Sequence, residues 1–272
     1  VAEEAKSANK KVHVGRILEI CVEKGSELPL GDPNRKFKGR VVFQGNNVRD
    51  ENWQAALFNE MSSAPASMEA GKSCDAYGLM PGNVIGQSDA EQAYIQARLG
   101  GDVATWVRLE RSQWPKAWAA MRDPVVPLKL APYGLPDAGG YWERHCETQL
   151  RSVGFVPIPD WRSCFWHAGL RLFLVVYVDD FKMSGPQDHM AKGWALIRKH
   201  IRTDPPQAVG KYLGCEHIVT ATTLDGIPTE DLALLVLPQA ADDAPSLSVR
   251  GGDPPTTLGP KSPTSRVWAS KE

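Results

Sequence analysis

The sequence predicts an α+β protein, in which strands and helices follow one another without regular alternation. Some segments combine β-branched residues with alternating polar ones, as strands do, whereas others have the composition of helices. A strand hairpin comes first, then helices, then a mixture of both, and this order differs from the strand–helix repeat of a doubly wound sheet. With 272 residues and 42% apolar content, the chain can bury a core of one or two lobes.

The N-terminal half is expected to begin with the hairpin. Its strands are residues 12–22 and 37–43, and the turn-forming run Gly31-Asp32-Pro33-Asn34 lies between them. The Ala-, Met- and Leu-rich stretch 53–80 predicts helices with a break near Pro65. A strand that ends in an acid, a turn or short helix, and a further strand are expected at residues 84–89, 90–97 and 105–109.

The C-terminal half is expected to open with a helix over residues 137–153, with Asp137 as its N-cap and Gly154 as its stop. Two paired strands, a third strand beyond a tight turn, an amphipathic helix and a closing strand are expected at residues 164–166, 171–178, 181–184, 188–201 and 211–219. Seven of the 21 prolines fall in the last 52 residues. Residues 221–272 therefore predict a largely disordered tail with at most one ordered piece, 232–237.

The composition favours an intracellular protein that is neither secreted nor inserted in a membrane. Residues 1–11 are polar and lack the apolar core of a signal peptide, and the apolar run 172–178 is too short to cross a bilayer. Five cysteines without a framework spacing favour reduced thiols. His145-Cys146 and the C-x-x-H spacing of Cys164 and His167 leave a zinc site open as a weak alternative.

The charge is distributed unevenly along the chain. Residues 221–272 hold four Lys/Arg and seven Asp/Glu, which leaves residues 1–220 with a net charge of +2. Phosphate binding depends on local clustering of cations, and a basic cluster lies in the hairpin region at Arg35, Lys36, Lys38, Arg40 and Arg49. Taken alone, this cluster fits an ordinary solvated loop equally well.

Two adjacent acids close an apolar strand in the run Tyr177-Val178-Asp179-Asp180. Side chains alternate along a strand, so neighbouring acids can face one site only where the backbone turns. A hairpin tip supplies this turn and brings together two negative charges that a divalent cation would offset. The alternative is a polar β-turn without further function.

Asp89 supplies a third acid at the end of an earlier strand, which could pair with the strand that carries Asp179 and Asp180. Three carboxylates can bind two Mg²⁺ ions. Such ions activate the attacking 3′-hydroxyl and stabilise the leaving pyrophosphate, so the three acids favour nucleotidyl transfer.

Six segments, in this order, resemble the reverse transcriptase of copia-type (Pseudoviridae-like) LTR retrotransposons. The resemblance covers residues from about 36 to 217, two thirds of the chain. The matching segments are Phe37-Lys38-Gly39-Arg40-Val41-Val42-Phe43-Gln44-Gly45, Ser88-Asp89-Ala90-Glu91-Gln92-Ala93-Tyr94, Pro132-Tyr133-Gly134-Leu135, Trp142, Tyr177-Val178-Asp179-Asp180 and Lys211-Tyr212-Leu213-Gly214-Cys215-Glu216.

The resemblance implies a right-hand polymerase whose fingers precede an RRM-like palm, an antiparallel sheet backed by helices, with little or no thumb. Residues 1–35 would be an N-terminal extension and the start of the fingers, residues 36–220 the fingers and palm, and residues 221–272 the tail. The implied activity is RNA-directed DNA synthesis on an RNA or DNA template–primer with dNTPs. The chain would belong to a larger polyprotein with ribonuclease H and integrase segments, in a cytoplasmic particle or the nucleus.

The resemblance also assigns roles to individual residues. Asp89, Asp179 and Asp180 would be catalytic and would hold two Mg²⁺ ions, or Mn²⁺ in their place. Lys38 and Arg40 would contact the triphosphate. Tyr94 would act as a steric gate against ribonucleotides, unless it is an ordinary core aromatic. The remaining substrate contact would be Tyr177, and the nucleic-acid contacts would be Tyr212 and Gly214.

The chain departs from the family at Pro136 and Asp137, which replace a Lys-Gln pair near the incoming nucleotide. We expect Asp137 to cap the following helix. Acids of ribonuclease H, the integrase zinc motif and a protease signature are not found in this chain. Two alternatives to an active polymerase are an inactive retroelement remnant that keeps the fold and binds nucleic acid, and an RRM-like RNA-binding module without a metal site.

Overall fold

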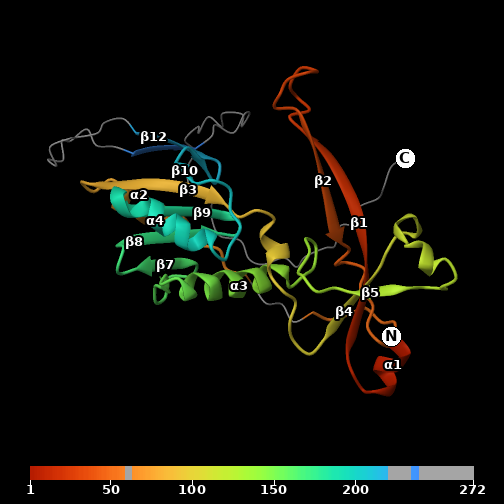
Figure 1. The fold of residues 1–272 in the computed structure, drawn as a ribbon. Helices are drawn as coiled ribbons and strands as arrows, with labels where there is room; N and C mark the ends of the chain where they lie inside the picture. Colours follow the sequence, from red (N-terminus) through yellow and green to blue (C-terminus); the bar gives the residue numbers. More distant parts are fainter. Residues whose placement is uncertain (59–62, 220–233, 239–272) are drawn as a thin grey trace, which may run out of the picture. The chain divides into compact units, whose positions relative to one another are not determined.

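The computed structural model describes residues 1–58, 63–219 and 234–238, and residues 1–238 form one compact unit. Figure 1 shows a mixed α+β fold with a small number of helices, as the sequence predicts. Its strands form sheets of four, six and three strands. None of the helices in the described ranges is long and apolar enough to cross a membrane.

The four-stranded sheet has the order β2-β1-β4-β5. Its strands are β1 (Val12–Lys24), β2 (Lys36–Phe43), β4 (Ala104–Arg108) and β5 (Val125–Pro127). The predicted hairpin is confirmed, because β1 and β2 pair antiparallel from Lys24 opposite Lys36 to Ile17 opposite Phe43. A boundary at residue 35 therefore falls between two paired strands. The short elements around this sheet are α1 (Ala2–Ser7), η2 (Arg111–Gln113) and η3 (Lys116–Trp118).

The six-stranded sheet is antiparallel throughout and has the order β10-β3-β9-β8-β7-β6. Its strands are β10 (Gln207–Ala208), β3 (Asn83–Asp89), β9 (Asp180–Pro186), β8 (Leu172–Tyr177), β7 (Cys164–His167) and β6 (Val156–Pro157). The predicted strands at 84–89, 164–166 and 171–178 are thus confirmed. The two-residue turn between β8 and β9 lies at the end of the sheet where β3 also ends, since β3 pairs with β9 so that Asp89 stands opposite Asp180.

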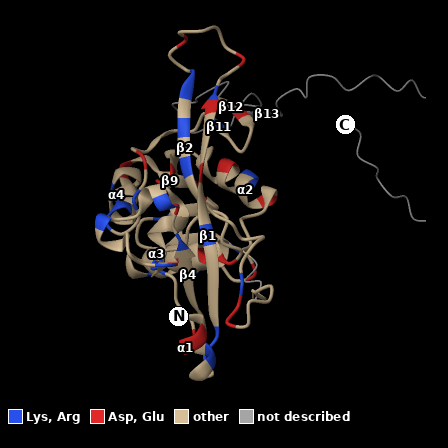
Figure 2. Cartoon of the chain, turned by 90° about the vertical axis from the view of Figure 1, so that its right-hand side faces the viewer, with Lys and Arg blue, Asp and Glu red and all other residues tan. Residues whose placement is uncertain are grey.

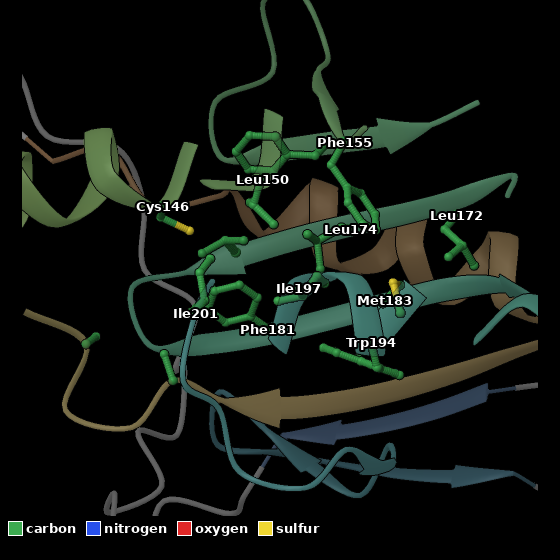
Figure 3. Packing of buried hydrophobic residues seen from close by; sticks show 14 of the residues in the cluster. Cys146, Leu150, Phe155, Leu172, Leu174, Phe181, Met183, Trp194, Ile197 and Ile201 are labelled. Atoms are coloured by element: carbon green, nitrogen blue, oxygen red, sulfur yellow. The ribbon is translucent and has the colours of Figure 1, made fainter. Parts of the chain in front are cut away.

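Helices cover both faces of this sheet. The helices α3 (Ala138–Ser152) and α4 (Gln187–Arg198) pack on one face, where Leu174, Phe181 and Met183 are fully buried (Figure 3). On the other face α2 (Met68–Gly78) packs against Phe173 and Val175 through Ala70 and Cys74. Because side chains of β8 alternate between the two faces, the continuous apolar run 172–176 is buried on both.

The third sheet corrects the expectation of one closing strand over residues 211–219. The chain forms a hairpin there, with β11 (Lys211–Tyr212) and β12 (Cys215–Val219) joined by Leu213 and Gly214. Both turn residues have positive φ, 48° and 81°, which suits a tight hairpin turn and ends the extended strand. The strand β13 (Leu234–Pro238) pairs with β12 and overlaps the piece 232–237; the rest of the predicted disordered tail lies outside the described residues.

The helix predicted before Pro65 is wrong for residues 53–58, and residues 59–62 lie outside the described ranges. Residues 53–58 form bends, a bridge and irregular backbone, and the helix described within 53–80 is α2, after Pro65. The Asp50 carboxylate accepts hydrogen bonds from the backbone N–H groups of Asn52 and Gln54, both at 2.8 Å. Such a local side-chain bond gives the backbone an alternative to the helix, which composition alone does not reveal.

The helix α3 begins and ends where the sequence predicts. Gly154, with φ of +93°, follows it as the stop. Asp137 stands at the N-cap position, but its side chain makes no capping hydrogen bond, so the expected capping role is wrong. Its φ and ψ of −91° and 4° differ from the extended conformation that a capping side chain requires. The short helix expected within 90–97 is η1 (Ala93–Gln96).

Candidate active site

The structure brings the three predicted acids to one edge of the six-stranded sheet. Asp89, the last residue of β3, lies directly opposite Asp180, the first residue of β9. Directly opposed residues of an antiparallel pair point to the same face of the sheet. Asp179 precedes Asp180 in the β8–β9 turn, and its carbonyl accepts a hydrogen bond from the N–H of Ala90 at 2.7 Å.

The turn that carries Asp179 is held from two sides. Val178 has φ of +57°, a conformation that costs a β-branched residue conformational energy. Its carbonyl accepts a hydrogen bond at 2.7 Å from the indole N–H of Trp142, which is buried in α3. The bonds from Trp142 and Ala90 together fix the turn against α3 and the end of β3.

Partial burial and neighbouring carboxylates both disfavour the charged forms of Asp89 and Asp180. Partial burial, then Asp179 and Asp89, raise the pKa of the Asp180 carboxyl to about 6. Partial burial, Asp204 and Asp179 also raise the pKa of Asp89. Among the described residues, the groups that shift these two pKa values include no lysine or arginine.

Asp204 is an additional acid that the sequence interpretation missed. The N–H of Asp204 donates to the carbonyl of Asp89 at 2.9 Å, and the Ser88 hydroxyl donates to the carbonyl of Asp204 at 2.7 Å. The exposed Asp204 side chain lies close enough to raise the pKa of Asp89. Its sequence neighbourhood, Thr203-Asp204-Pro205-Pro206, reads as an ordinary turn and carries no signal of an acidic site.

These carboxylates suit Mg²⁺ in donor type and in charge, since hard divalent cations prefer carboxylate oxygens. Within the ranges that the structure describes, however, no group of three or more His, Cys, Asp or Glu side chains is arranged to chelate an ion. Asp89, Asp179 and Asp180 would have to rotate toward one another to close on a cation. The carboxylates therefore fit Mg²⁺ in their chemistry, but their side chains do not converge on one point in this structure.

A second set of residues extends from this edge toward the β1–β2 hairpin. The rings of Tyr94 and Tyr133 lie 4.8 Å apart, and the Arg40 guanidinium lies 5.9 Å from the centre of the Tyr133 ring. Partial burial and Asp179 raise the pKa of both tyrosines. Tyr94 packs against the cores of both the six-stranded and the four-stranded sheet. This position fits a core aromatic residue as well as a steric gate.

Tyr133 was not among the predicted site residues, although its segment was. The carbonyl of Tyr133 accepts a hydrogen bond from the N–H of Phe43 at 2.7 Å. Gly134 follows with φ of +83°, and a Cβ there would lie 2.2 Å from the carbonyl oxygen of Phe43. The glycine therefore permits the close approach that holds Tyr133 against the end of β2.

Lys38 is not brought to the acids by any contact in the described part of the chain. It lies on β2 opposite Val22, on the same face as Arg40 and Lys36, and all three cations are exposed. Figure 2 shows these basic residues along β2. Arg35 of the sequence cluster is instead paired with Glu23, and Arg49 lies beyond the end of β2, so only the other three cations of the cluster form a row on this strand.

Tyr177 and the β11–β12 hairpin lie on the same side of the sheet as the acids. Tyr177 is the register partner of Asp180 on β8. Tyr212 is buried, and burial together with Asp180 raises the pKa of its hydroxyl. Gly214 is exposed in the hairpin turn, where its positive φ explains the glycine without reference to a ligand.

The zinc alternative is not supported. Cys146 belongs to the core on the α3 side of the sheet and Cys164 to the core on the α2 side, so the two thiols face away from each other. A cavity of about 780 Å³ is lined by Arg98, Tyr141, Arg144 and His145 among other residues. None of the three predicted site acids, Asp89, Asp179 and Asp180, lines it.

Comparisons with known proteins leave the family open. Neither a family model nor a curated protein matches the chain. Among solved structures, a telomerase from Candida albicans in complex with a fragment of telomeric RNA is similar with a TM-score of 0.35 and 10% sequence identity. This likeness covers 86% of the present chain and 46% of the telomerase chain. At that TM-score the likeness supports neither a common fold nor a common function.

Proposed function

We propose that this chain is the polymerase core of a copia-type reverse transcriptase, an RNA-directed DNA polymerase. The observation that carries the proposal is the meeting of Asp89 with Asp179 and Asp180, about 90 residues further along the sequence, at an edge where no lysine or arginine among the described residues shifts the pKa values of Asp89 and Asp180. A fold without this chemistry gains nothing from such repulsion.

In this proposal the six-stranded sheet is the palm and the four-stranded sheet belongs to the fingers. Mg²⁺ bound by the three carboxylates would neutralise charge on the reacting phosphates. Arg40 would bind triphosphate oxygens from the fingers side, and its position over Tyr133 supports this because Tyr133 in turn contacts Tyr94. The Tyr94 ring would exclude a 2′-hydroxyl and so select dNTPs.

Primer extension with the full 272-residue chain tests the proposal. We expect dTTP incorporation on a poly-A template with an oligo-dT primer and Mg²⁺, and a loss of about a thousandfold or more in Asp179→Asn, by analogy with the removal of one group that stabilises transition-state charge. Asp102→Asn, a substitution at an exposed loop acid, should retain full activity. Equal incorporation by the wild type and Asp179→Asn would exclude the proposed chemistry.

A second candidate is an inactive remnant that retains the fold and binds nucleic acid. The observation in its favour is the replacement of a Lys-Gln pair by Pro136 and Asp137, which removes a cation and adds an acid near the proposed nucleotide site. This candidate predicts template–primer binding that EDTA does not alter, together with no incorporation. Restoring the pair with Pro136→Lys/Asp137→Gln would then leave incorporation absent, whereas in an active enzyme it should lower the KM for dTTP.

A further inference from the structure

A buried polar cluster lies next to the acids on the same face of the sheet. Lys182, two residues after Asp180 on β9, is 1% exposed. Its ammonium forms an ion pair with the Asp75 carboxylate of α2 and a hydrogen bond of 2.9 Å with Nε2 of His217 on β12. Both partners are buried as well. One lysine therefore links three elements that are far apart in sequence.

The contacts of Lys182 satisfy an ammonium that has left water. Because an ammonium can only donate, Nε2 of His217 accepts, and the ring proton resides on Nδ1, which donates to the carbonyl of Gly210 at 3.1 Å. The Lys182 ammonium also lies 4.8 Å from the centre of the Tyr212 ring, within cation–π distance. The Lys182 ammonium therefore has an anion, a hydrogen-bond acceptor and a ring against it, and such partners are the condition under which a buried charge is tolerated.

Gln87 completes the cluster from the neighbouring strand. It is the register partner of Lys182 on β3, two residues before Asp89, and it is buried. Its carboxamide oxygen accepts from the N–H of Gly210 at 3.1 Å, and its amide donates to the carbonyl of Lys211 at 3.2 Å. The strands that carry Asp89 and Asp180 thus each place one polar side chain on the β11–β12 hairpin.

The side chains of Lys182 and Gln87 join the β11–β12 hairpin to the six-stranded sheet, where strand pairing does not. In the described part of the chain, β11, β12 and β13 form a sheet of their own, and no strand ladder joins it to the six-stranded sheet. The short strand β10 pairs with β3 just before β11, and beyond it the described contacts between the two sheets on this face come from the side chains of Lys182 and Gln87. An apolar contact would allow the hairpin to shift, whereas hydrogen bonds to a lysine, a glutamine and a histidine specify one position.

We infer that Lys182, Asp75, His217 and Gln87 are positioning residues that fix the β11–β12 hairpin beside Asp180. The inference rests on the proposed function, and it takes Tyr212 and Gly214 of this hairpin, the nucleic-acid contacts that the family resemblance implies, to support the 3′ end of the primer. Tyr212 connects the buried cluster with Asp180. Its ring lies over the Lys182 ammonium, and burial together with Asp180 raises the pKa of its hydroxyl. Loss of the cluster misplaces the primer end and leaves nucleotide binding intact.

The test uses the double variant Asp75→Asn/Lys182→Met in the full chain. Removing both charges together avoids the unpaired buried carboxylate that Lys182→Met alone would leave. Hydrogen exchange of the amides of residues 211–218 should accelerate about tenfold or more, while the amides of β8 keep their protection. In primer extension, kcat should fall about thirtyfold, with the KM for dTTP changed less than threefold.

A matched control makes the same chemical change at an exposed ion pair. Glu147→Gln/Arg151→Met alters the surface pair on α3 and should change neither exchange in residues 211–218 nor kcat. An active wild type with an unchanged kcat in the Asp75/Lys182 variant would overturn the positioning role. Faster exchange without a change in kcat would overturn it equally. A wild type no more active than Asp179→Asn would instead refute the proposed function, so the two failures are distinguishable.

Discussion

The β8–β9 pair and the β1–β2 hairpin are built in opposite ways. Residues 172–176 of β8 and 181–185 of β9 are buried, because helices cover both faces of their sheet. On β2, every residue from Lys36 to Val41 is exposed, and only Phe43 at its end is buried. The acids therefore stand on a rigid support, whereas the cations of the hairpin stand on a two-stranded ribbon anchored at one end.

The difference separates two kinds of contribution to a phosphate-handling site. Charges that must converge within a few ångströms require packed support, because a small misplacement is costly in rate. Cations that attract a polyanion act over the Debye length of about 8 Å and tolerate a looser support. In this chain the acids stand on packed strands, and most of the exposed cations of β2 stand on the looser two-stranded ribbon.

The largest expected effect contrasts two phenylalanines. Phe181→Ala, in the core beneath the acids, should lower the free energy of unfolding by about 3–5 kcal/mol. Phe37→Ala, at a residue that is 76% exposed on β2, should change it by less than about 0.5 kcal/mol. Urea unfolding followed by tryptophan fluorescence measures both. Similar losses at the two positions would show that the hairpin is packed against something in solution.

Tyr94 tests the boundary between the two regions, since it contacts both cores. Tyr94→Ala should reduce discrimination between dTTP and UTP by roughly thirtyfold, or about 2 kcal/mol, because the ring no longer fills the space of a 2′-hydroxyl. Tyr94→Phe keeps the ring and should retain discrimination. The measurement is the ratio of kcat/KM for the two nucleotides. If both variants lost stability and neither lost selectivity, Tyr94 would be a core residue only.

Two cations on the same face of β2 are expected to differ. Arg40→Ala should raise the KM for dTTP about tenfold, or about 1.4 kcal/mol, because Arg40 reaches Tyr133 and through it Tyr94. Lys38→Ala should raise it threefold or less, since no contact connects Lys38 with the acids among the described residues. Arg198→Ala, at an exposed position on α4, is the control. Equal effects of Arg40 and Lys38 would mean that the hairpin acts through its net charge.

The sequence predicted the convergence of acids because two local signals were sufficient. Asp179 and Asp180 follow an apolar strand, and Asp89 ends another, so pairing the strands at these ends makes the acids meet. The closing hairpin was misread as one strand, since the composition of residues 211–219 carries the strand signal whereas the break depends on two positive φ angles at Leu213 and Gly214. Only the glycine is visible as a turn residue in sequence.

The buried cluster could not have been found from the sequence. In sequence, Lys182 between Phe181 and Met183 resembles an exposed lysine of an edge strand, and Asp75 resembles a residue on the polar face of a helix. Burial of Lys182 becomes tolerable only because Asp75 and His217, 107 and 35 residues away, lie against it. Side-chain partners at such separations depend on the tertiary arrangement, which no periodicity encodes. Asp204 and Tyr133 were missed for the same reason.

The smallest expected effect is a gain in stability from Asp180→Asn, because the amide removes a carboxylate charge that partial burial and then Asp179 and Asp89 disfavour. Solvent screens part of this effect, so we expect about 1 kcal/mol at pH 8 in EDTA. The pKa of Asp180 is raised from 3.8 to about 6, so the folded state binds this proton more tightly than the unfolded chain does. The wild type therefore loses stability as the pH rises from about 4 through about 6.

The gain from Asp180→Asn should accordingly be smaller at pH 5, where the folded wild type is mostly protonated at this residue, than at pH 8. Urea midpoints at the two pH values measure this difference, and Asp102→Asn should shift neither. An equal gain at both pH values would mean that packing of the amide, and not charge, is responsible. The pH-dependent result would show that the folded state disfavours the charged form of Asp180, through partial burial first and then through Asp179 and Asp89.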